Sequence, residues 1–273
     1  MRKLPVSTPD FDIEHGRAVP RPPLPGPKDA WAFFLDVDGT LLDIAPTPES
    51  VAPRADTVEL LERLAHAAGG AVALVSGRPI RQLDELFTPL TLAAAGLHGL
   101  EWRSADGTMH PADGVVPDLT GTVEQLEKFA RKHPGIRIED KGMTVALHYR
   151  QAPDAAPDAR RCVDKAARAL GDRVHVQEGK MVLEIKSIDA HKGMVVERFL
   201  AELPFAGRAP VFIGDDVTDE DAFAVVNRHG GYSIRVGTER TRPSAARWAL
   251  ATPSQVHSWL GRVTDCLEQK EQR

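Results

Sequence analysis

The chain contains three short apolar runs, each followed or flanked by residues that repeat at helical spacing. The runs are Trp31–Leu35, 71–75 and 210–213. An unbroken apolar run of this length is typical of a strand buried on both faces, as in a parallel sheet. Strands that alternate with helices predict an α/β fold with a Rossmann-like, doubly wound parallel sheet. The positions that predict these helices are Val58, Leu61, Leu64 and Ala65, then Pro79, Leu83, Leu86 and Phe87, and later the segments 191–202 and 219–227.

A different pattern fills residues 112–188. Two segments repeat apolar residues at helical spacing, and between and after them apolar residues alternate with polar ones. Alternation indicates strands with one packed and one open face, which suits an antiparallel sheet covered by two helices. We therefore expect an inserted α+β domain, residues 112–188, within a core formed by 28–111 and 189–273. The apolar positions are Leu119, Val123, Leu126 and Ala130; Cys162, Val163, Ala166 and Leu170; Val145, Leu147 and Tyr149; and Met181, Leu183 and Ile185.

The first 27 residues differ from both patterns. They hold seven of the 21 prolines and few large apolar residues. Such a segment buries too little apolar surface to offset the entropy lost on ordering. We expect residues 1–27 to form an extended or disordered tail.

Composition narrows the classes of protein without identifying one. The 273 residues are 42% hydrophobic and 27% charged, as in ordinary soluble globular proteins. The net charge of -5 gives no electrostatic basis for binding nucleic acid or an anionic membrane. Cys162 and Cys266 lack metal-ligand spacing and fit a reducing compartment. No apolar run approaches the ~20 residues of a membrane span, and no signal-peptide pattern opens the chain. We expect a cytoplasmic protein, with a monomer as the default.

Polar side chains gather where the apolar runs end. Asp36 and Asp38 follow the first run, and Ser76 follows the second. Ligands of an open α/β sheet bind outside the carboxyl ends of its strands, so we expect these side chains to meet. Taken alone, the first segment is also compatible with a surface Asp-Gly turn, and the acidic residues after the third run with helix capping. The complete set is Asp36 and Asp38; Ser76, Gly77 and Arg78; and Asp215, Asp216 and Asp219.

So many carboxylates at one edge need a compensating charge. Without one they repel each other and take up protons. A hard divalent cation resolves this, and a set of oxygen ligands favours Mg²⁺ over zinc. Lys192 adds a second cation at the start of a predicted helix, where a positive charge opposes the helix dipole. That mismatch favours a role in the site over a solvated surface lysine.

Together these segments resemble the four motifs of the haloacid-dehalogenase (HAD) superfamily of phosphohydrolases, in the same order and spacing. The insertion between the second and third motifs resembles a type C2 cap. More closely, the chain resembles trehalose-6-phosphate phosphatases from about Trp31 to Trp259. The resemblance implies a magnesium-dependent phosphatase that acts on a small sugar phosphate, trehalose 6-phosphate, in the last step of trehalose biosynthesis. The segments that carry it are 36–41, 76–78, 96–99, 148–150, 192–193 and 214–220.

The resemblance also implies a role for each residue of the site. Asp36 attacks phosphorus and forms an aspartyl-phosphate. Asp38 protonates the leaving sugar oxygen and later activates water. The other assignments are metal ligands, Asp36, Asp215 and the backbone carbonyl of Asp38; supports for those ligands, Asp216 and Asp219; and phosphate ligands, Ser76, Gly77, Arg78 and Lys192.

The open face of the inserted sheet is expected to select the substrate. Side chains between the packed ones, such as His148 and Glu184, face away from the packed layer. Charged residues on an exposed sheet face are usually just solvated, and a loop histidine such as His98 is often only structural. The resemblance singles out, as contacts to sugar hydroxyls, Glu139, Lys141, Arg150, Lys180 and Glu184, with His98 as a bridge between the domains or a sugar ligand.

Three other functions compete with this interpretation. The nearest is a capped phosphatase for sucrose phosphate or a hexose phosphate. A phosphoacceptor signalling domain also gathers acidic residues around one aspartate, but it has no inserted domain and no second aspartate such as Asp38. A catalytically silent binding module is disfavoured because every expected catalytic group is present. The two-domain layout further predicts closure of the cap, with hinges near 111–113 and 187–190.

Overall fold

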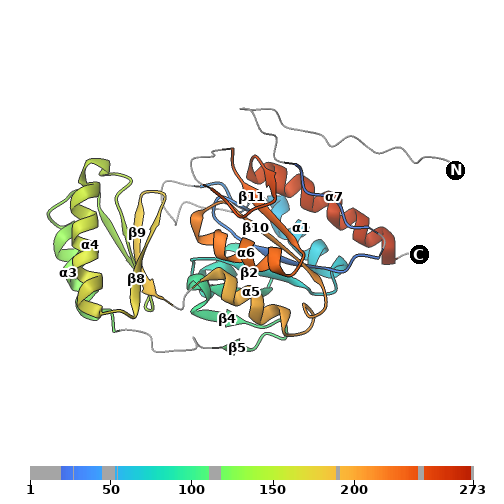
Figure 1. Ribbon diagram of the computed structural model, residues 1–273, viewed down its shortest axis with the longest axis horizontal. Helices are drawn as coiled ribbons and strands as arrows, with labels where there is room; N and C mark the ends of the chain where they lie inside the picture. The colour runs from blue at the N-terminus through green and yellow to red at the C-terminus, as the bar shows by residue number, and fades with distance from the viewer. Residues whose placement is uncertain are drawn as a thin grey trace.

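The computed structural model describes residues 20–26, 28–44, 53, 55–110, 118–188, 191–238 and 243–271. They form two bodies, a larger one at the right of Figure 1 and a smaller one at its left. We call residues 118–188 the cap and the remaining described residues the core.

An eight-stranded sheet forms the centre of the core, in the order β12-β11-β10-β1-β2-β3-β4-β5. Neighbours from β12 to β3 are parallel, whereas β4 pairs antiparallel with β3, and β5 with β4. The predicted parallel sheet is confirmed, and the antiparallel edge is an addition that the sequence pattern did not indicate. The strands are β1 (Trp31–Leu35), β2 (Val72–Val75), β3 (Ala93–Gly96), β4 (Glu101–Arg103), β5 (Met109–His110), β10 (Ala209–Gly214), β11 (Tyr232–Val236) and β12 (Trp248–Leu250).

Helices cover both faces of the core sheet, as expected for a doubly wound fold. In β1, Trp31, Phe33 and Leu35 pack into one apolar layer, whereas Ala32 and Phe34 pack into the other. Alternate residues of a strand point to opposite faces, so a strand between two helical layers is apolar throughout. One layer contains α1 (Ala55–Ala67), α2 (Ile80–Phe87) and α7 (Pro253–Glu271), and the other contains α5 (Lys192–Leu200) and α6 (Glu220–Arg228).

The strand order reverses beside β1. From β1 the chain runs outward through β2 and β3 on one side, and from β10 through β11 and β12 on the other. The two strands at the reversal lie in register, with Leu35 opposite Ile213, so their carboxyl ends meet. A reversal of this kind opens a crevice where ligands of α/β proteins bind. The first and fourth motifs both begin at this point.

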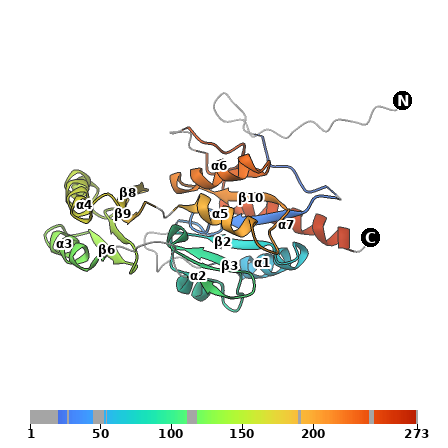
Figure 2. The ribbon, with the colours of Figure 1, turned by 60° about the horizontal axis from the view of Figure 1, so that its bottom comes forward.

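The cap is an antiparallel sheet with two helices on one face. Its strand order is β6-β7-β9-β8, and its apolar layer lies between the sheet and the helices. Figures 1 and 2 both show the helices on the side away from the core and the sheet next to it. The sequence indicated β7 and β9 but neither β6 nor β8. The elements are β6 (Arg137–Asp140), β7 (Val145–His148), β8 (Val174–Gly179), β9 (Val182–Ser187), α3 (Thr120–Ala130) and α4 (Ala156–Leu170).

Part of the N-terminal segment packs against the core. Residues 20–26 have neither helix nor strand, as expected for the tail, but they lie against the core. The indole Nε1 of Trp259 donates to the carbonyl oxygens of Pro22 and Pro23, at 3.2 Å each. Part of the expected tail therefore contacts the core, and the domain boundary at residue 28 stays a prediction. Residues 1–19 of the expected tail lie outside the described residues, as do 111–113 and 189–190 of the expected hinges.

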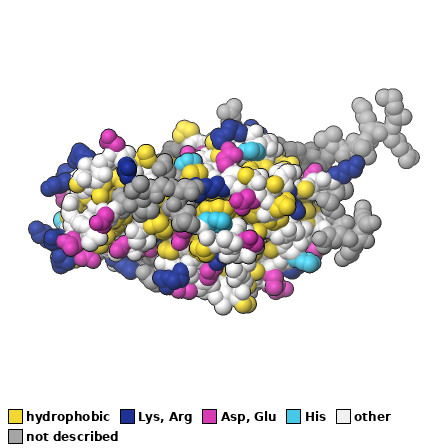
Figure 3. Space-filling model, turned by 90° about the horizontal axis from the view of Figure 1, so that it is seen from below, with side chains coloured by type: hydrophobic (Ala, Val, Ile, Leu, Met, Phe, Trp, Pro, Cys, Tyr) yellow, Lys and Arg dark blue, Asp and Glu magenta, His cyan; other side chains and the backbone are white. Residues whose placement is uncertain are grey.

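Charged side chains of both signs cover the face of the molecule seen in Figure 3. On the cap helices, exposed ion pairs one turn apart join Lys128 with Glu124 and Arg160 with Asp164. Such pairs contribute at most about 1 kcal/mol, so apolar packing holds the cap together. Among the helices in the described ranges, none combines the length and apolarity needed to span a membrane.

Candidate active site

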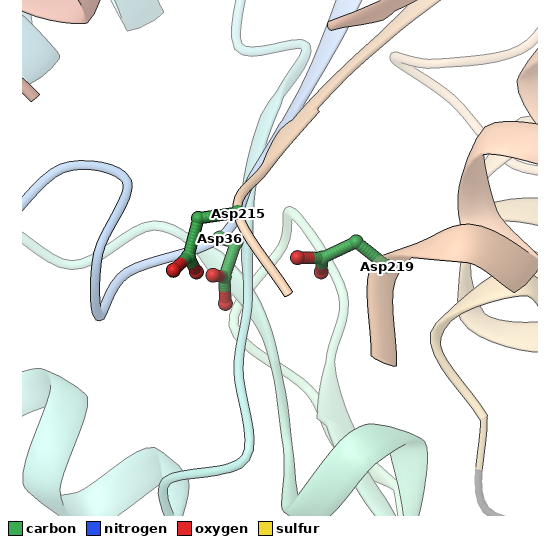
Figure 4. Close-up of side chains that lie close together, drawn as sticks. All are labelled: Asp36, Asp215 and Asp219. Carbon is green, nitrogen blue, oxygen red and sulfur yellow. The ribbon is translucent and has the colours of Figure 1, made fainter. Parts of the chain in front are cut away.

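Three carboxylates meet at the strand reversal. Asp36 follows β1, Asp215 follows β10, and Asp219 ends the short 3₁₀ helix η4 (Val217–Asp219); oxygens of all three lie within 4.8 Å of one another. Figure 4 shows the carboxylates of Asp36 and Asp215 side by side, with that of Asp219 pointing toward them. Burial, together with the neighbouring carboxylates, raises the pKa of Asp36 well above its ordinary value and that of Asp215 to about 6. The cluster therefore carries an excess of negative charge that a cation would relieve.

Lys192 supplies part of the compensating charge. Its Nζ lies 2.6 Å from Asp36 Oδ1 and 2.6 Å from Asp219 Oδ1, and the residue is 2% exposed. Burial lowers the pKa of Lys192, but the carboxylates of Asp219 and Asp36 outweigh it and raise that pKa above its ordinary value. This lysine is the first residue of α5, where its positive charge opposes the helix dipole. Its ammonium group is also buried away from water, and its contacts with the carboxylates offset both costs. Lys180 adds a second ammonium, 2.8 Å from Asp215 Oδ2. Two ammonium groups still leave the three carboxylates with excess negative charge, which a hard cation would relieve.

Asp216 and Asp219 have different positions, although the sequence suggested the same role for both. Asp216 caps η4: it accepts from the Asp219 backbone, and its own backbone N–H donates to Asp219 Oδ2 at 2.9 Å. The carboxylate of Asp219 thus accepts hydrogen bonds both from the Asp216 backbone at the start of η4 and from Lys192. It also belongs to the acidic cluster itself. Capping, the simpler explanation for this acidic run, accounts for Asp216.

Gly39 makes room for the cluster. Its φ is +81°, in the left-handed region, and a Cβ there would stand 2.3 Å from Asp215 Oδ2. Left-handed backbone costs an ordinary residue about 1–2 kcal/mol, and this contact adds a clash with a candidate metal ligand. The turn after β1 therefore requires glycine for two separate reasons.

We expect Gly39→Ala to weaken Mg²⁺ binding roughly tenfold, which is about 1.4 kcal/mol, because the new methyl displaces the Asp215 carboxylate. Gly107→Ala is the matched control, since Gly107 has a φ of +87° and no atom within 4 Å of the Cβ position. Calorimetric titration with Mg²⁺ and thermal unfolding in EDTA measure the two effects separately. Equal losses of Mg²⁺ affinity in the two variants would show that the Asp215 contact is irrelevant.

The loop after β2 faces the acidic cluster. Ser76 is 1% exposed, and its Oγ accepts from the backbone N–H of Arg78 at 3.1 Å. The Arg78 guanidinium reaches Asp38 with two hydrogen bonds of 2.7 Å, from Nε and Nη2. A Cβ at Gly77 would lie 2.7 Å from the ring of His98, so only glycine fits there. The loop thus presents a hydroxyl and a bare backbone to the site.

A left-handed turn after β3 braces this loop. Leu97, His98 and Gly99 have φ values of 51°, 58° and 102°. The backbone N–H of Leu97 donates to the carbonyl of Arg78 at 3.1 Å, and that of His98 to the carbonyl of Ser76 at 3.0 Å. Backbone strain at two residues other than glycine persists only where surrounding contacts enforce it, and it is common at functional sites. The Gly-Leu-His-Gly motif therefore fixes the shape of the loop after β2.

The same histidine joins the core to the cap. Its Nε2 lies 3.0 Å from Glu184 Oε2 of β9, and both side chains are buried. Glu184 Oε1 accepts from Thr144 at 2.7 Å and from Lys141 Nζ at 3.2 Å, and Lys141 also donates to the carbonyl of Gly77 at 3.1 Å. Despite burial, Lys141 and His98 hold the pKa of Glu184 well below its ordinary value. The cap face that alternation marked as open is thus buried against the core at this point.

His98 is expected to make the protein more stable as pH rises from about 4 to 6.5. Burial lowers the pKa of His98 from 6.5 to about 4, so the unfolded chain binds more protons than the folded one in this window. Urea unfolding of wild type and His98→Asn in EDTA, from pH 4.5 to 7, measures the effect. The difference in unfolding free energy, wild type minus variant, should grow by more than about 1 kcal/mol. A flat difference for His98→Asn would contradict the expectation.

Core and cap together enclose a cavity of about 310 Å³. This volume suits a small molecule, and its wall is mostly polar at the core end. Of the residues that the sequence singled out, Asp219 alone does not line the cavity, because it is buried behind Lys192. The residues predicted as site residues that line the cavity are Asp36, Asp38, Ser76, Gly77, Arg78, His98, Glu139, Lys141, Arg150, Lys180, Glu184, Lys192, Asp215 and Asp216.

The cap residues in this wall already contact each other or the core. Glu139 Oε2 lies 2.9 Å from His148 Nε2, and Lys180 Nζ lies 2.8 Å from Asp215 Oδ2. Arg150 Nη2 donates to the carbonyl of Lys180 at 3.4 Å. Whether these groups bind sugar hydroxyls stays a prediction, as does the role of the Asp38 carbonyl as a metal ligand.

Other residues near the cavity were missed in the sequence, among them Gln82, Arg137, Gln151, Gln177 and Thr144. Gln177 lines it from β8, opposite Glu184 in the strand pairing, and Thr144 orients Glu184 from the start of β7. The signal for both was present: Val174 and Val176 alternate with the open-face positions of β8, and Thr144 precedes the alternating residues of β7.

Comparison with known proteins indicates the same family as the sequence motifs. The family model described as trehalose-phosphatase matches residues 34–254. The chain is 42% identical to trehalose-6-phosphate phosphatase of Escherichia coli K12, over 89% of this chain and 90% of that protein. It is 46% identical to a probable trehalose-phosphate phosphatase of Sinorhizobium fredii, over 77% of this chain and 78% of that protein.

Solved structures agree on the fold. The C-terminal domain of Candida albicans trehalose-6-phosphate phosphatase matches 87% of this chain and 93% of its own, with a TM-score of 0.75 at 24% identity. A haloacid dehalogenase-like hydrolase from Bacteroides thetaiotaomicron matches 89% of this chain and 99% of its own, with a TM-score of 0.59 at 14% identity. The predicted HAD core with an inserted cap is therefore confirmed.

Proposed function

This chain belongs to the trehalose-phosphatase family, and we propose that it hydrolyses trehalose 6-phosphate to trehalose and inorganic phosphate. The reaction is the last step of trehalose biosynthesis. The observation that carries the proposal is the position of Asp36, buried at the strand reversal, bonded to Lys192, and lining a cavity closed on its far side by the cap.

In the proposed first step, Asp36 forms a bond to phosphorus as the bond from phosphorus to the sugar oxygen breaks. Asp38 gives its proton to the departing sugar oxygen. Without that proton the oxygen would have to leave as an alkoxide, which is a poor leaving group. Ser76, the backbone N–H of Gly77, and Lys192 stabilise the phosphoryl oxygens. Their burial supports this role, since fixed donors act more strongly where water is excluded.

In the proposed second step, Asp38 takes a proton from water as the water oxygen attacks phosphorus. The bond between Asp36 and phosphorus breaks, which frees inorganic phosphate and restores the carboxylate of Asp36. The same carboxyl thus serves as acid and then as base, which explains why one group beside the nucleophile is sufficient.

We propose Mg²⁺ as the cofactor, held by Asp36 and Asp215 with the backbone carbonyl of Asp38. The all-oxygen donor set and the raised pKa of Asp36 and Asp215, caused by burial and nearby carboxylates, support a hard cation. When bound, the ion neutralises the phosphoryl oxygens and the nucleophile. Asp219 and Asp216 keep Lys192 and the loop after β10 in place around these ligands.

We propose the cap as the source of sugar selectivity. A disaccharide presents many hydroxyls, and the cap wall offers donors and acceptors in matching variety. A site built for hydroxyls strongly rejects analogues that lack them. The proposed contacts are Glu139, Lys141, Arg150, Lys180 and Glu184, with His98 on the core side.

Phosphate release from four substrates tests the proposal: trehalose 6-phosphate, sucrose 6-phosphate, glucose 6-phosphate and p-nitrophenyl phosphate, each with Mg²⁺ and with EDTA. We expect trehalose 6-phosphate to be preferred at least about 10²-fold in kcat/KM, with activity lost in EDTA. Preference for another sugar phosphate would keep the chemistry and discard the substrate. Inactivity on all four would favour a signalling or binding role.

A further inference from the structure

Arg78 is the one side chain in the loop after β2 that reaches across to the first motif. Its Nε and Nη2 donate to the two carboxylate oxygens of Asp38, at 2.7 Å each. The Arg78 side chain is only 11% exposed, whereas that of Asp38 is 38% exposed and lines the cavity. The pair is therefore held from the protein side and open on the substrate side.

The backbone around Arg78 is fixed before its side chain is placed. Its N–H donates to Ser76 Oγ at 3.1 Å, and its carbonyl accepts from Leu97 at 3.1 Å. Ser76 and Asp38 follow neighbouring parallel strands, β2 and β1, so the guanidinium spans one strand spacing. A planar fork bonded to both oxygens fixes the rotation of the carboxylate as well as its position.

We propose that Arg78 is a positioning residue that holds the Asp38 carboxyl toward the reacting oxygen, in addition to lining the phosphate side of the cavity. This inference rests on the proposed function, because it gives Asp38 a proton to transfer. An arginine neither gives nor takes protons near neutral pH, so it orients Asp38 without exchanging protons with it. Its positive charge also favours the ionised carboxylate that acts as base in the second step. The sequence suggested only phosphate binding for this residue.

The two roles predict different kinetics. Release of p-nitrophenolate needs no acid, so kcat/KM for p-nitrophenyl phosphate reports formation of the aspartyl-phosphate without help from Asp38. Release of a sugar oxygen does need the acid, and hydrolysis of the aspartyl-phosphate needs the base. Loss of orientation should therefore leave kcat/KM for p-nitrophenyl phosphate nearly unchanged. It should lower kcat/KM for trehalose 6-phosphate and slow the hydrolysis of the aspartyl-phosphate. Loss of a phosphate ligand should lower kcat/KM for both substrates and weaken inhibition by inorganic phosphate.

The test compares Arg78→Gln and Arg78→Lys with wild type, Asp38→Asn and the double variant Asp38→Asn/Arg78→Gln, in Mg²⁺. For Arg78→Gln we expect kcat/KM for trehalose 6-phosphate to fall about 10²-fold. We expect kcat/KM for p-nitrophenyl phosphate to change less than about threefold, with a burst of p-nitrophenolate that matches the enzyme concentration. The inhibition constant of inorganic phosphate should stay within about twofold of wild type.

The double variant gives an independent answer that needs only trehalose 6-phosphate. If Arg78 acts through Asp38, the double variant should be no slower than Asp38→Asn alone. Arg78→Lys should fall between wild type and Arg78→Gln, because a lysine can pair with Asp38 but not with both oxygens in one plane. Melting temperatures verify that each variant is folded.

Three results would overturn the inference. Equal losses on both substrates with weaker phosphate inhibition would make Arg78 a phosphate ligand. Multiplying losses in the double variant would make its action independent of Asp38. Unchanged kinetics in Arg78→Gln would make the ion pair dispensable. Failure of the proposed function gives a different result, since wild type itself would then release no phosphate from trehalose 6-phosphate.

Discussion

Asp36→Asn is expected to lower phosphate release from trehalose 6-phosphate by at least about 10⁴-fold, because the amide cannot form the covalent intermediate. No other described carboxylate can replace it. Asp215 and Asp219 lie in the same cluster, but Asp219 is fully buried behind Lys192 and Asp215 is paired with Lys180. The measurement is single-turnover phosphate release at saturating Mg²⁺ and substrate.

The same substitution is expected to stabilise the metal-free protein. Burial raises the pKa of Asp36 on folding, so its ionisation costs folding stability once pH exceeds the ordinary value of 3.8. An uncharged amide of the same shape avoids this cost and still accepts a hydrogen bond from Lys192. Urea unfolding at pH 7 in EDTA should show a gain of about 1 kcal/mol or more.

Asp172→Asn, in an exposed turn of the cap, is the control for a general effect of removing one negative charge. It should change neither activity nor stability appreciably. Activity within tenfold of wild type in Asp36→Asn would remove this residue as nucleophile. A loss of stability in EDTA would show that the attraction between Lys192 and the charged Asp36 outweighs the cost of burying that charge beside other carboxylates.

Lys192→Met should be the most damaging single change for both folding and catalysis. It leaves Asp36 and Asp219 buried without their shared cation, and breaking a buried pair in this way costs about 3–5 kcal/mol. It also removes a fixed donor to the phosphoryl group, worth about 10²–10³-fold in kcat. Urea unfolding in EDTA and phosphate release in Mg²⁺ measure the two losses.

A second variant separates these two losses. Lys192→Met/Asp219→Asn removes one of the two carboxylates that lost their shared cation. It should recover part of the stability without recovering activity. Recovery of activity together with stability would mean that Lys192 acts only as a structural group. Unchanged stability in Lys192→Met would mean that the carboxylates are relieved in some other way, for example by protonation.

Periodicity was sufficient to predict the fold class, although the parallel strands β3, β11 and β12 and the helix α7 were not predicted individually. The run Trp31–Leu35 is apolar throughout because helices pack on both of its faces, and this made β1 visible in the sequence. The cap strand β7 was visible for the opposite reason, since one face alone is packed. The edge strands β4 and β5 have three and two residues, too few to show any period.

The site could be predicted where residues follow strands, and less well where contacts cross between elements. Asp36 and Asp215 meet because the strands before them pair in register, which the alternation of strands and helices implied. That Asp219 rather than Asp216 joins the cluster depends on the direction of one turn of helix. That Arg78 bonds Asp38 depends on a side-chain rotamer, which no spacing records. The contact of residues 20–26 with Trp259 was hidden because proline-rich composition says nothing about packing.

The alternation along the cap strands also affects how this protein can change. On β9, Leu183 and Ile185 support folding, whereas Glu184 between them faces the cavity. Under the proposed role of the cap, selection for its apolar layer and selection for a new substrate therefore act on interleaved residues of one strand. Because the proposed nucleophile lies in the core and the proposed sugar contacts lie in the cap, we expect that the choice of sugar can change while the chemistry is retained. A library restricted to every second residue of β7, β8 and β9 is thus a rational route to phosphatases for other sugars.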